Sequence, residues 1–237
     1  MSEAKKTILI SGAGTGIGRA TALAFSGAGW NVAGFGRRLE PLHSLEKQIE
    51  RQGGRALVFQ ADSSSEEAVA RLVEETVIGF GGLDAVFANS GTAKVARIED
   101  ASPADFRSQI ESNVIGALVL IKAAIPHLEK NRGHIFVNTS ISSRLSFPGW
   151  GAYSASKAAL ALFTRVLRKE MREKGIRVTE VIPGATATEI WDEVAPEISK
   201  RGMVAPESVA SAILAAAMVP PEASVDEIKI TPSKGNL

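Results

Sequence analysis

The sequence alternates short apolar runs with longer amphipathic stretches, and this alternation constrains the fold more than any other feature. Most of the short runs are continuously apolar, which is typical of strands buried on both faces of a parallel sheet. We predict strands at 6–11, 31–36, 55–60, 83–89, 134–140 and 176–182, and a shorter seventh at 227–231. Regular β-α alternation with right-handed crossovers predicts a doubly wound, Rossmann-type α/β fold with a parallel sheet of about seven strands and helices on both faces.

Helix start signals support this alternation. Ser63 followed by Glu66 fits a capping box. Ser102 followed by Pro103 fits an N-cap with proline at the first helical position, and Pro206 opens a further helix. Because no repeat, low-complexity tract or composition shift marks a linker, we expect residues 1–237 to form a single domain.

Composition and charge exclude several classes of function. The chain is 45% apolar and 22% charged, which suits a globular domain with a substantial core. Its net charge of +1 gives no broad field for nucleic acid or an anionic membrane, so neither partner is expected. The sequence contains no cysteine, and its start does not fit a signal peptide, so we expect a cytoplasmic protein. The spacing of His43, His127 and His134 fits no metal site, and no metal is expected.

The stretch SGAGTGIGRA, residues 11–20, places glycine at every second position directly after the first predicted strand. So much glycine indicates positive φ angles or a close approach of the backbone to another group. The pattern G-x-G-x-x-G fails because Ile17 and Arg19 occupy the positions of its last glycine. At a strand-to-helix junction, however, backbone N–H groups and the helix N-terminus can face a pyrophosphate. The alternative is a glycine-rich turn without a ligand.

Further motifs follow the later strands. Asp62 comes after the third predicted strand, ANSG (88–91) after the fourth, and Asn113 lies in the helical stretch IESNVIG. Ser140 lies thirteen residues before Tyr153, which begins the Y-x-x-x-K stretch YSASK (153–157), and PGATAT (183–188) follows the sixth strand. With the glycine spacing G-x-x-x-G-x-G at 12–18, these motifs resemble the short-chain dehydrogenase/reductase family over nearly all of residues 6–231.

The resemblance implies a role for each motif. The catalytic group would be Asn113, Ser140, Tyr153 and Lys157. Lys157 would also bind the nicotinamide ribose, Asn113 would hold a water in the proton relay, and Asp62 would bond adenine. The implied cofactor contacts are Gly12, Thr15, Gly16, Ile17, Gly18, Arg37, Arg38, Asp62, Ser63, Asn89, Gly91, Tyr153, Lys157, Pro183, Gly184, Thr186 and Thr188. Residues 1–237 would then form a single dinucleotide-binding and catalytic domain, with a substrate loop around 186–205.

These residue types suit hydride chemistry. Tyr153 and Lys157 lie four apart in a helical stretch and share a face, so we expect the ammonium to lower the pKa of the phenol. Ser140 could donate a hydrogen bond to a carbonyl oxygen as negative charge develops on it. The chain is therefore expected to be an enzyme that transfers hydride between a nicotinamide cofactor and a ketone, aldehyde or secondary alcohol, with Tyr153 as general acid and base.

The end of the second predicted strand bears on cofactor choice. An NAD enzyme would place an acidic residue there, whereas this corner reads GFGRR, with Gly36 at the acid position and Arg37 and Arg38 after it. Guanidinium groups suit a 2′-phosphate, so NADP(H) is expected to be preferred. NAD(H) stays the alternative, because Thr15 stands where some NADP-preferring relatives carry a second basic residue.

Two further expectations concern partners. The resemblance implies that the segments with Phe147, Trp150, Ile190 and Trp191 border the substrate, and such side chains favour an apolar or aromatic carbonyl compound. The alternative for the tryptophans is packing in the core. On a helical wheel from Tyr153, Leu160, Leu167 and Met171 form one apolar stripe, and Ala155, Ala159, Leu162 and Val166 form a second, nearly opposite. The second stripe and the family resemblance predict a homo-oligomer, most simply a tetramer, and the alternative is burial of this stripe within the same chain.

Two other functions stay open. A sensor or scaffold could bind the dinucleotide without chemistry, although such a protein would be expected to lose catalytic side chains that are present here. A dehydratase or epimerase of related fold is disfavoured by the short C-terminal region.

Overall fold

A fully parallel seven-stranded sheet forms the centre of the molecule, in a computed structural model that describes residues 5–235. The strands are β1 Thr7–Ser11, β2 Asn31–Gly36, β3 Ala56–Gln60, β4 Ala85–Ala88, β5 His134–Asn138, β6 Arg177–Pro183 and β7 Glu227–Ile230. Their order across the sheet is β3-β2-β1-β4-β5-β6-β7. The predicted strands and the doubly wound, Rossmann-type architecture are confirmed.

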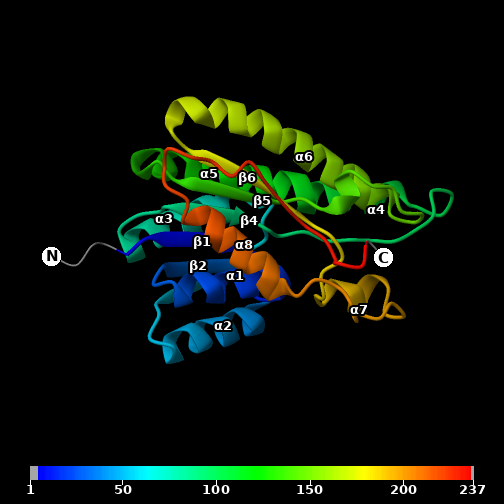
Figure 1. The fold of residues 1–237 in the computed structure, drawn as a ribbon, viewed down its shortest axis with the longest axis horizontal. Helices are drawn as coiled ribbons and strands as arrows, with labels where there is room; N and C mark the ends of the chain where they lie inside the picture. Colours follow the sequence, from blue (N-terminus) through cyan, green and yellow to red (C-terminus); the bar gives the residue numbers. More distant parts are fainter. Residues whose placement is uncertain (1–4, 236–237) are drawn as a thin grey trace.

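Helices cover both faces of this sheet (Figure 1). The longer ones are α1 Gly16–Gly27, α2 Leu39–Arg51, α3 Glu66–Phe80, α4 Pro103–Ile110, α5 Gly116–Asn131, α6 Gly151–Met171 and α8 Pro206–Ala217. Side chains of α1, α2 and α8 share one apolar core with the sheet, and those of α3, α5 and α6 share the other. Strands such as β1 and β4 are buried throughout because both cores need apolar side chains from them.

The helix start signals are confirmed in two cases and wrong in one. Ser102 caps α4 by accepting a hydrogen bond from the Asp105 amide, with Pro103 in the first turn, and α8 begins at Pro206. The predicted capping box at Ser63 is wrong, because α3 begins later and its N-cap is Ser65, which accepts from the Ala68 amide. The chain still turns at 62–64, where Asp62 Oδ1 accepts hydrogen bonds from the Ser64 amide and hydroxyl, so the helix begins later than predicted.

A π-helical turn, Glu111–Ile115, joins α4 to α5 and contains Asn113. By length and composition the combined run Pro103–Asn131 could cross a membrane. Its side chains Leu120, Ile121 and Leu128, however, are buried in the core that contains α3 and α6. This run is therefore a core helix of the fold.

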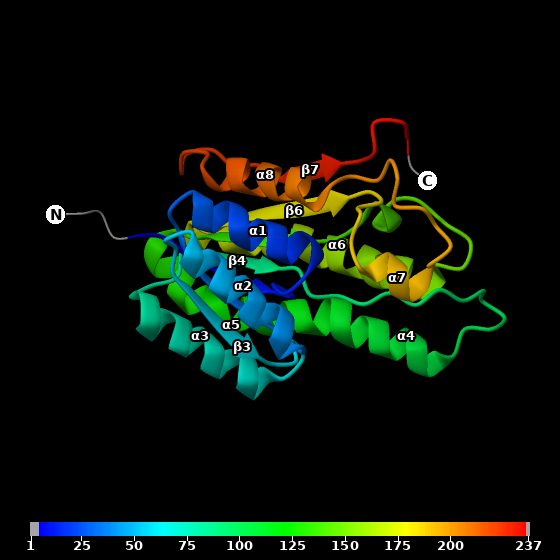
Figure 2. The ribbon, with the colours of Figure 1, turned by 90° about the horizontal axis from the view of Figure 1, so that it is seen from below.

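Several loops meet at the carboxyl ends of the strands. The strand order reverses between β1 and β4, and ligands of doubly wound sheets bind at such a switch point. Figure 2 shows β7 pointing toward the end of the molecule where the short helix α7, Ile190–Val194, and α4 lie. Candidate site residues from the ends of β1, β2, β4, β5 and β6 all come to this edge.

Candidate active site

The glycine loop between β1 and α1 has a conformation that side chains would obstruct. Gly12 and Gly16 have φ angles of 65° and 52°, a region that favours glycine. A Cβ on Gly18 would lie 2.2 Å from the carbonyl oxygen of Gly12, so the loop and the first turn of α1 pack as closely as backbone allows. Thr15, the N-cap residue, makes no side-chain cap, which leaves the first amides of α1 available to an anion.

Ser11 connects this loop to the end of β4. Its hydroxyl oxygen accepts hydrogen bonds from the amides of Asn89 and Ser90, each 2.9 Å long. The Asn89 side chain donates back to the Ser11 carbonyl at 3.0 Å and accepts from the Asn138 side chain at 2.9 Å. A hydroxyl at position 11 and an amide at position 89 therefore hold the ends of β1, β4 and β5 together.

Two adjoining cavities occupy the carboxyl edge of the sheet, with volumes of about 330 Å³ and 450 Å³. They share the glycine loop, the segment after β4 and the start of α7, so they form one elongated cleft. The predicted residues lining the first cavity are Gly12, Thr15, Gly16, Ile17, Asn89, Gly91, Ser140, Tyr153, Lys157, Pro183, Gly184, Thr186 and Thr188. Those lining the second are Gly12, Thr15, Arg37, Arg38, Asp62, Ser63 and Gly91. Gly18 and Asn113 lie behind the cleft wall.

Tyr153 and Lys157 reach the first cavity from the first turns of α6, and Ser140 reaches it from the end of β5. The expectation that the pKa of the phenol lies below its ordinary value is wrong. Burial raises the pKa of Tyr153, and a side-chain hydrogen bond with Ser140 opposes this increase. The ammonium lies 5.8 Å from the centre of the Tyr153 ring and points to a main-chain carbonyl instead.

That carbonyl belongs to Asn138, whose oxygen accepts a hydrogen bond of 2.8 Å from Lys157 Nζ. Lys157 is 3% exposed, and burial lowers its pKa to about 8. Near neutral pH most of the molecules therefore carry an ammonium at the cleft wall.

Asn113 is fully buried and forms hydrogen bonds with the segment after β4 and with α6. Its Oδ1 accepts from the Thr92 amide at 2.8 Å, and its Nδ2 donates to the Thr92 carbonyl and to Ser156 Oγ. Ser156 in turn donates to the carbonyl of Tyr153. The π-helical turn thus connects the segment after β4 to the start of α6.

The second cavity ends at a basic corner. Arg37 and Arg38 are exposed after β2, and Asp62 lies opposite them after β3. Hydrogen bonds from Ser64 lower the pKa of Asp62, so this carboxylate stays ionised beside the guanidinium of Arg37. The corner offers two cations and one acceptor at the far end of the cleft from Tyr153.

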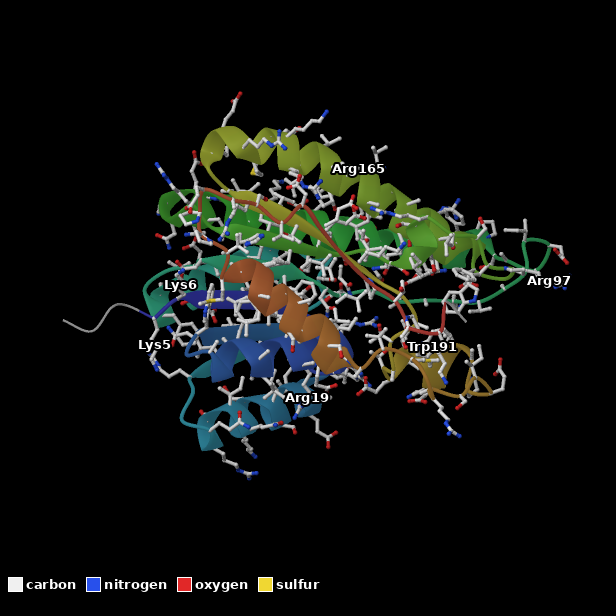
Figure 3. All side chains as sticks on the ribbon, viewed as in Figure 1. Lys5, Lys6, Arg19, Arg97, Arg165 and Trp191 are labelled. Atoms are coloured by element: carbon white, nitrogen blue, oxygen red, sulfur yellow. The ribbon has the colours of Figure 1, made fainter. Side chains whose placement is uncertain are left out.

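Aromatic side chains form the wall of the first cavity next to Tyr153. The ring of Trp150 meets the Tyr153 ring edge to face at 5.4 Å and lies 5.6 Å from the ring of Trp191. Trp191, on α7 (Figure 3), is oriented by a hydrogen bond from its Nε1 to the Thr186 carbonyl. Backbone bonds between 185–187 and Val204 close the segment that carries α7 into a flap over the cavity.

Sequence reasoning missed Asn138, Ile141, Glu189 and Ile198, all of which line the first cavity. Asn138 could have been found, since it is a polar residue at the end of an otherwise apolar strand. Glu189 follows the PGATAT motif directly. Ile141 and Ile198 carry no signal, because an apolar residue in a loop is indistinguishable from a core residue until the loop is placed.

Comparisons with known proteins agree with this geometry. The profile of the short chain dehydrogenase family matches residues 6–199. An uncharacterised oxidoreductase of Staphylococcus aureus is 33% identical over 96% of this chain and 97% of its own length. A glucose 1-dehydrogenase of Gluconobacter oxydans is 36% identical over 79% of this chain and 71% of its own length.

Solved structures show the same fold. An alcohol dehydrogenase of the archaeon Thermococcus sibiricus, complexed with 5-hydroxy-NADP, superimposes with a TM-score of 0.91 and 27% identity, covering 98% of this chain and 99% of that one. Fold, motif order and a profile match that spans most of the sequence agree, and the chain belongs to the short-chain dehydrogenase family.

Proposed function

We propose that the chain is an NADP(H)-dependent oxidoreductase that reduces a ketone or aldehyde, or oxidises the matching secondary alcohol, with Tyr153 as general acid and base. Membership of the family makes the chain an oxidoreductase that binds a nicotinamide dinucleotide. The observation that carries the finer proposal is that Ser140, Tyr153 and Lys157 line the same cavity as the glycine loop.

The residues of the cleft fit a dinucleotide. Gly12 and Gly16 have no side chains, so a ligand can approach the backbone there closely. The N-terminus of α1, which has no side-chain cap, suits a pyrophosphate. A Cβ on Gly91 would lie 2.9 Å from Asn113 Oδ1, so a side chain there would displace Asn113 behind the cleft wall. Arg37 and Arg38 offer bidentate donors for a 2′-phosphate, and the Thermococcus relative carries an NADP analogue. The bound nicotinamide would supply the hydride.

The chain's own residues manage the proton and the developing charge. The raised pKa keeps the Tyr153 phenol protonated and able to donate to a substrate oxygen. Ser140 can donate to the same oxygen as its negative charge grows. Once Tyr153 has given up its proton, the Lys157 ammonium nearby stabilises the phenolate.

The cavity wall favours a substrate with an apolar or aromatic group. Trp150, Trp191 and Phe147 face the space beside Tyr153, with Ile141 and Ile198 next to them. Lys157 and Glu189 supply the charge of this lining, and both lie toward the proposed cofactor. The flap around 186–205 is the proposed substrate loop, within the single domain expected for the chain.

Assembly and location belong to the same proposal. The second stripe of α6 is exposed, with Leu162 and Val166 at 58% and 49%. Leu118 on α5 and Phe106 on α4 are exposed as well. Pairing of these helices between copies would bury these side chains, which supports a homo-oligomer and most simply a tetramer. A cytoplasmic location agrees with a sequence that lacks cysteine.

The test is NADPH consumption across a panel of ketones and aldehydes, followed by Tyr153→Phe. The variant keeps the ring and its contact with Trp150 but removes the proton donor, so kcat should fall by ~10²–10⁴. NADPH binding should be retained, because the glycine loop and the arginine corner are untouched. Lys157→Ala should weaken both activity and binding, and Ser140→Ala should mainly lower kcat.

Two results would count against the proposal. Near parental turnover by Tyr153→Phe would remove Tyr153 from the mechanism. A parent protein that binds NADPH but reduces no compound of a broad panel would favour the sensor function instead.

A further inference from the structure

A carboxylate is buried in the interior of β6, where an apolar residue would be expected. The side chain of Glu180 is 1% exposed. Its Oε1 accepts a hydrogen bond of 2.9 Å from Thr139 Oγ1, and its Oε2 lies 3.9 Å from Arg144 Nη2. Within residues 5–235 this second oxygen has no hydrogen-bond partner. A buried carboxylate with an unpaired oxygen lowers the stability of a fold, so stability alone does not account for Glu180.

Two of the groups near Glu180 flank Ser140 in sequence. Thr139 directly precedes it, and Arg144 follows the single 3₁₀ turn Ile141–Ser143. Inside this turn the Ser143 amide donates to the Ser140 carbonyl at 3.0 Å, and the Arg144 amide donates to the Ile141 carbonyl at 2.9 Å. A segment so short and internally bonded moves as one piece, so fixing its two ends fixes the serine.

Arg144 also contacts the neighbouring strand. Its Nη2 lies 2.7 Å from Glu227 Oε2, and Glu227 is the residue of β7 directly opposite Glu180 in the β6–β7 register. Two adjacent carboxylates would repel one another, and the guanidinium between them offsets this repulsion. Burial raises the pKa of Glu180 above its ordinary value, and the Thr139 hydroxyl and the charge of Arg144 offset this increase only in part.

We infer that Glu180 is a positioning residue that holds the Ser140 segment at both ends, through the hydroxyl of Thr139 and the guanidinium of Arg144. Glu180 and Arg144 lie outside the cavity wall, whereas Thr139 and Ser140 form part of it. The effect on activity rests on the proposed function, because Ser140 must meet the oxygen that Tyr153 protonates. The effect on the rigidity of the Ser140 segment does not depend on the proposed function.

The substitution Glu180→Leu removes both contacts but could prevent folding, so the decisive variant is Thr139→Val. Valine has the shape of threonine without the hydroxyl, which lies 2.9 Å from Glu180 Oε1 and 3.0 Å from the Val181 carbonyl oxygen. Glu180→Gln, which leaves the Val181 contact in place and removes the carboxylate charge, separates the two contacts and should loosen the segment in the same direction. Thr139→Ser is the rescue variant, because it restores that hydroxyl. Thr179→Val is the matched control: Thr179 is buried in the same strand as Glu180 and its hydroxyl donates to the Val225 carbonyl, far from the serine segment.

The experiment has two measurements: amide hydrogen exchange of residues 140–145 and steady-state kinetics. Thr139→Val should speed exchange in this segment and lower kcat, each by about tenfold, while the Kd for NADPH stays within about twofold of the parent. Thr139→Ser should restore both quantities. Thr179→Val should lower the melting temperature while leaving exchange at 140–145 and kcat near the parental values.

Unaltered exchange and unaltered kcat in folded Thr139→Val would overturn the inference. So would equal loosening of the segment in Thr179→Val, which would indicate a general loss of stability. If the parent reduces no carbonyl compound, the proposed function fails, and the exchange arm still decides whether Glu180 holds the segment through Thr139.

Discussion

Lys157 Nζ donates a hydrogen bond of 2.8 Å to the carbonyl oxygen of Asn138, the last residue of β5. The bond holds the ammonium at the cleft wall, 5.8 Å from the centre of the Tyr153 ring. Burial nevertheless raises the pKa of the phenol, and a side-chain hydrogen bond with Ser140 opposes this increase.

This arrangement predicts the titration of Tyr153. The sequence contains a single tyrosine, so ultraviolet difference absorbance reports one phenol. In the cofactor-free protein its pKa should lie above the ordinary value of 10.0 because burial disfavours the phenolate. Ser140→Ala should raise it further by removing the hydrogen bond that stabilises the charged form. A midpoint below 10.0 in the folded parent would contradict this prediction.

The arginine corner predicts cofactor preference. Replacing both Arg37 and Arg38 by alanine should raise the Kd for NADPH by about 10–100-fold, because charge-assisted hydrogen bonds to the 2′-phosphate are lost. The Kd for NADH should change by less than about threefold. Fluorescence titration measures both, and Arg51→Ala, an exposed arginine at the end of α2, is the control. A parent that uses NADH as well as NADPH would refute the preference.

The aromatic wall predicts substrate choice. Trp191→Ala removes the ring that contacts Trp150, so kcat/KM for an aryl ketone should fall by about 3–10-fold or more. A small aliphatic aldehyde, which leaves this wall uncovered, should be affected far less. Trp191→Phe should retain most of the discrimination. Higher kcat/KM of the parent for small anionic keto acids than for aryl ketones would contradict an apolar pocket.

The exposed face of α6 predicts assembly. Leu160, Leu167 and Met171 are buried within the chain, so the stripe that contains Leu162 and Val166 is free to meet another copy. Light scattering at micromolar concentration should give a multiple of 25.0 kDa, and Leu162→Glu should reduce it. Ile78→Glu, on the exposed side of α3 at 80% exposure, should not. A monomeric parent would be incompatible with this expectation.

His134 predicts a pH dependence of stability. Its Nε2 lies 2.7 Å from Thr179 Oγ1, and the Thr179 hydroxyl already donates to the Val225 carbonyl, so Nε2 is the protonated nitrogen. Within residues 5–235, the buried Nδ1 has no partner, and protonating it would place an unpaired N–H and a charge in the core. Burial accordingly lowers the pKa of His134 to about 3.

The folded state therefore binds this proton more weakly than the unfolded chain does. The stabilising contribution is complete above the unfolded pKa near 6.5 and is lost as pH falls toward about 3, by up to ~1.4 kcal/mol per pH unit. Urea unfolding of the parent and of His134→Asn between pH 7 and 4.5 measures this contribution. It appears as the difference between the two proteins in the slope of the free energy of unfolding against pH. Parallel curves for the two proteins would exclude this role for His134.

The strands could be predicted from the sequence because each depends on a local property. A continuous apolar run such as 134–138 suits a strand buried on both faces, whichever strands are beside it. Ser102 with Pro103 starts a helix through backbone geometry that neighbouring residues determine. The order of the motifs also predicted which residues meet in the site, because the carboxyl ends of parallel strands lie at one edge of the sheet.

Contacts between distant residues were decided by the tertiary structure. Ser65 rather than Ser63 caps α3, because Asp62 Oδ1 accepts hydrogen bonds from the Ser64 amide and hydroxyl, and the helix begins after this turn. Helical spacing placed Lys157 on the same helix face as Tyr153. Burial, which the sequence does not show, raises the pKa of Tyr153 and lowers that of Lys157. The hydrogen-bond partner of Lys157 is the carbonyl of Asn138, nineteen positions away in sequence. Glu180 resembles an ordinary strand residue until Thr139 and Arg144 are brought to it. Sequence patterns record local backbone preference and burial, whereas pKa values and side-chain partners depend on which distant groups the strand order brings within a few ångströms.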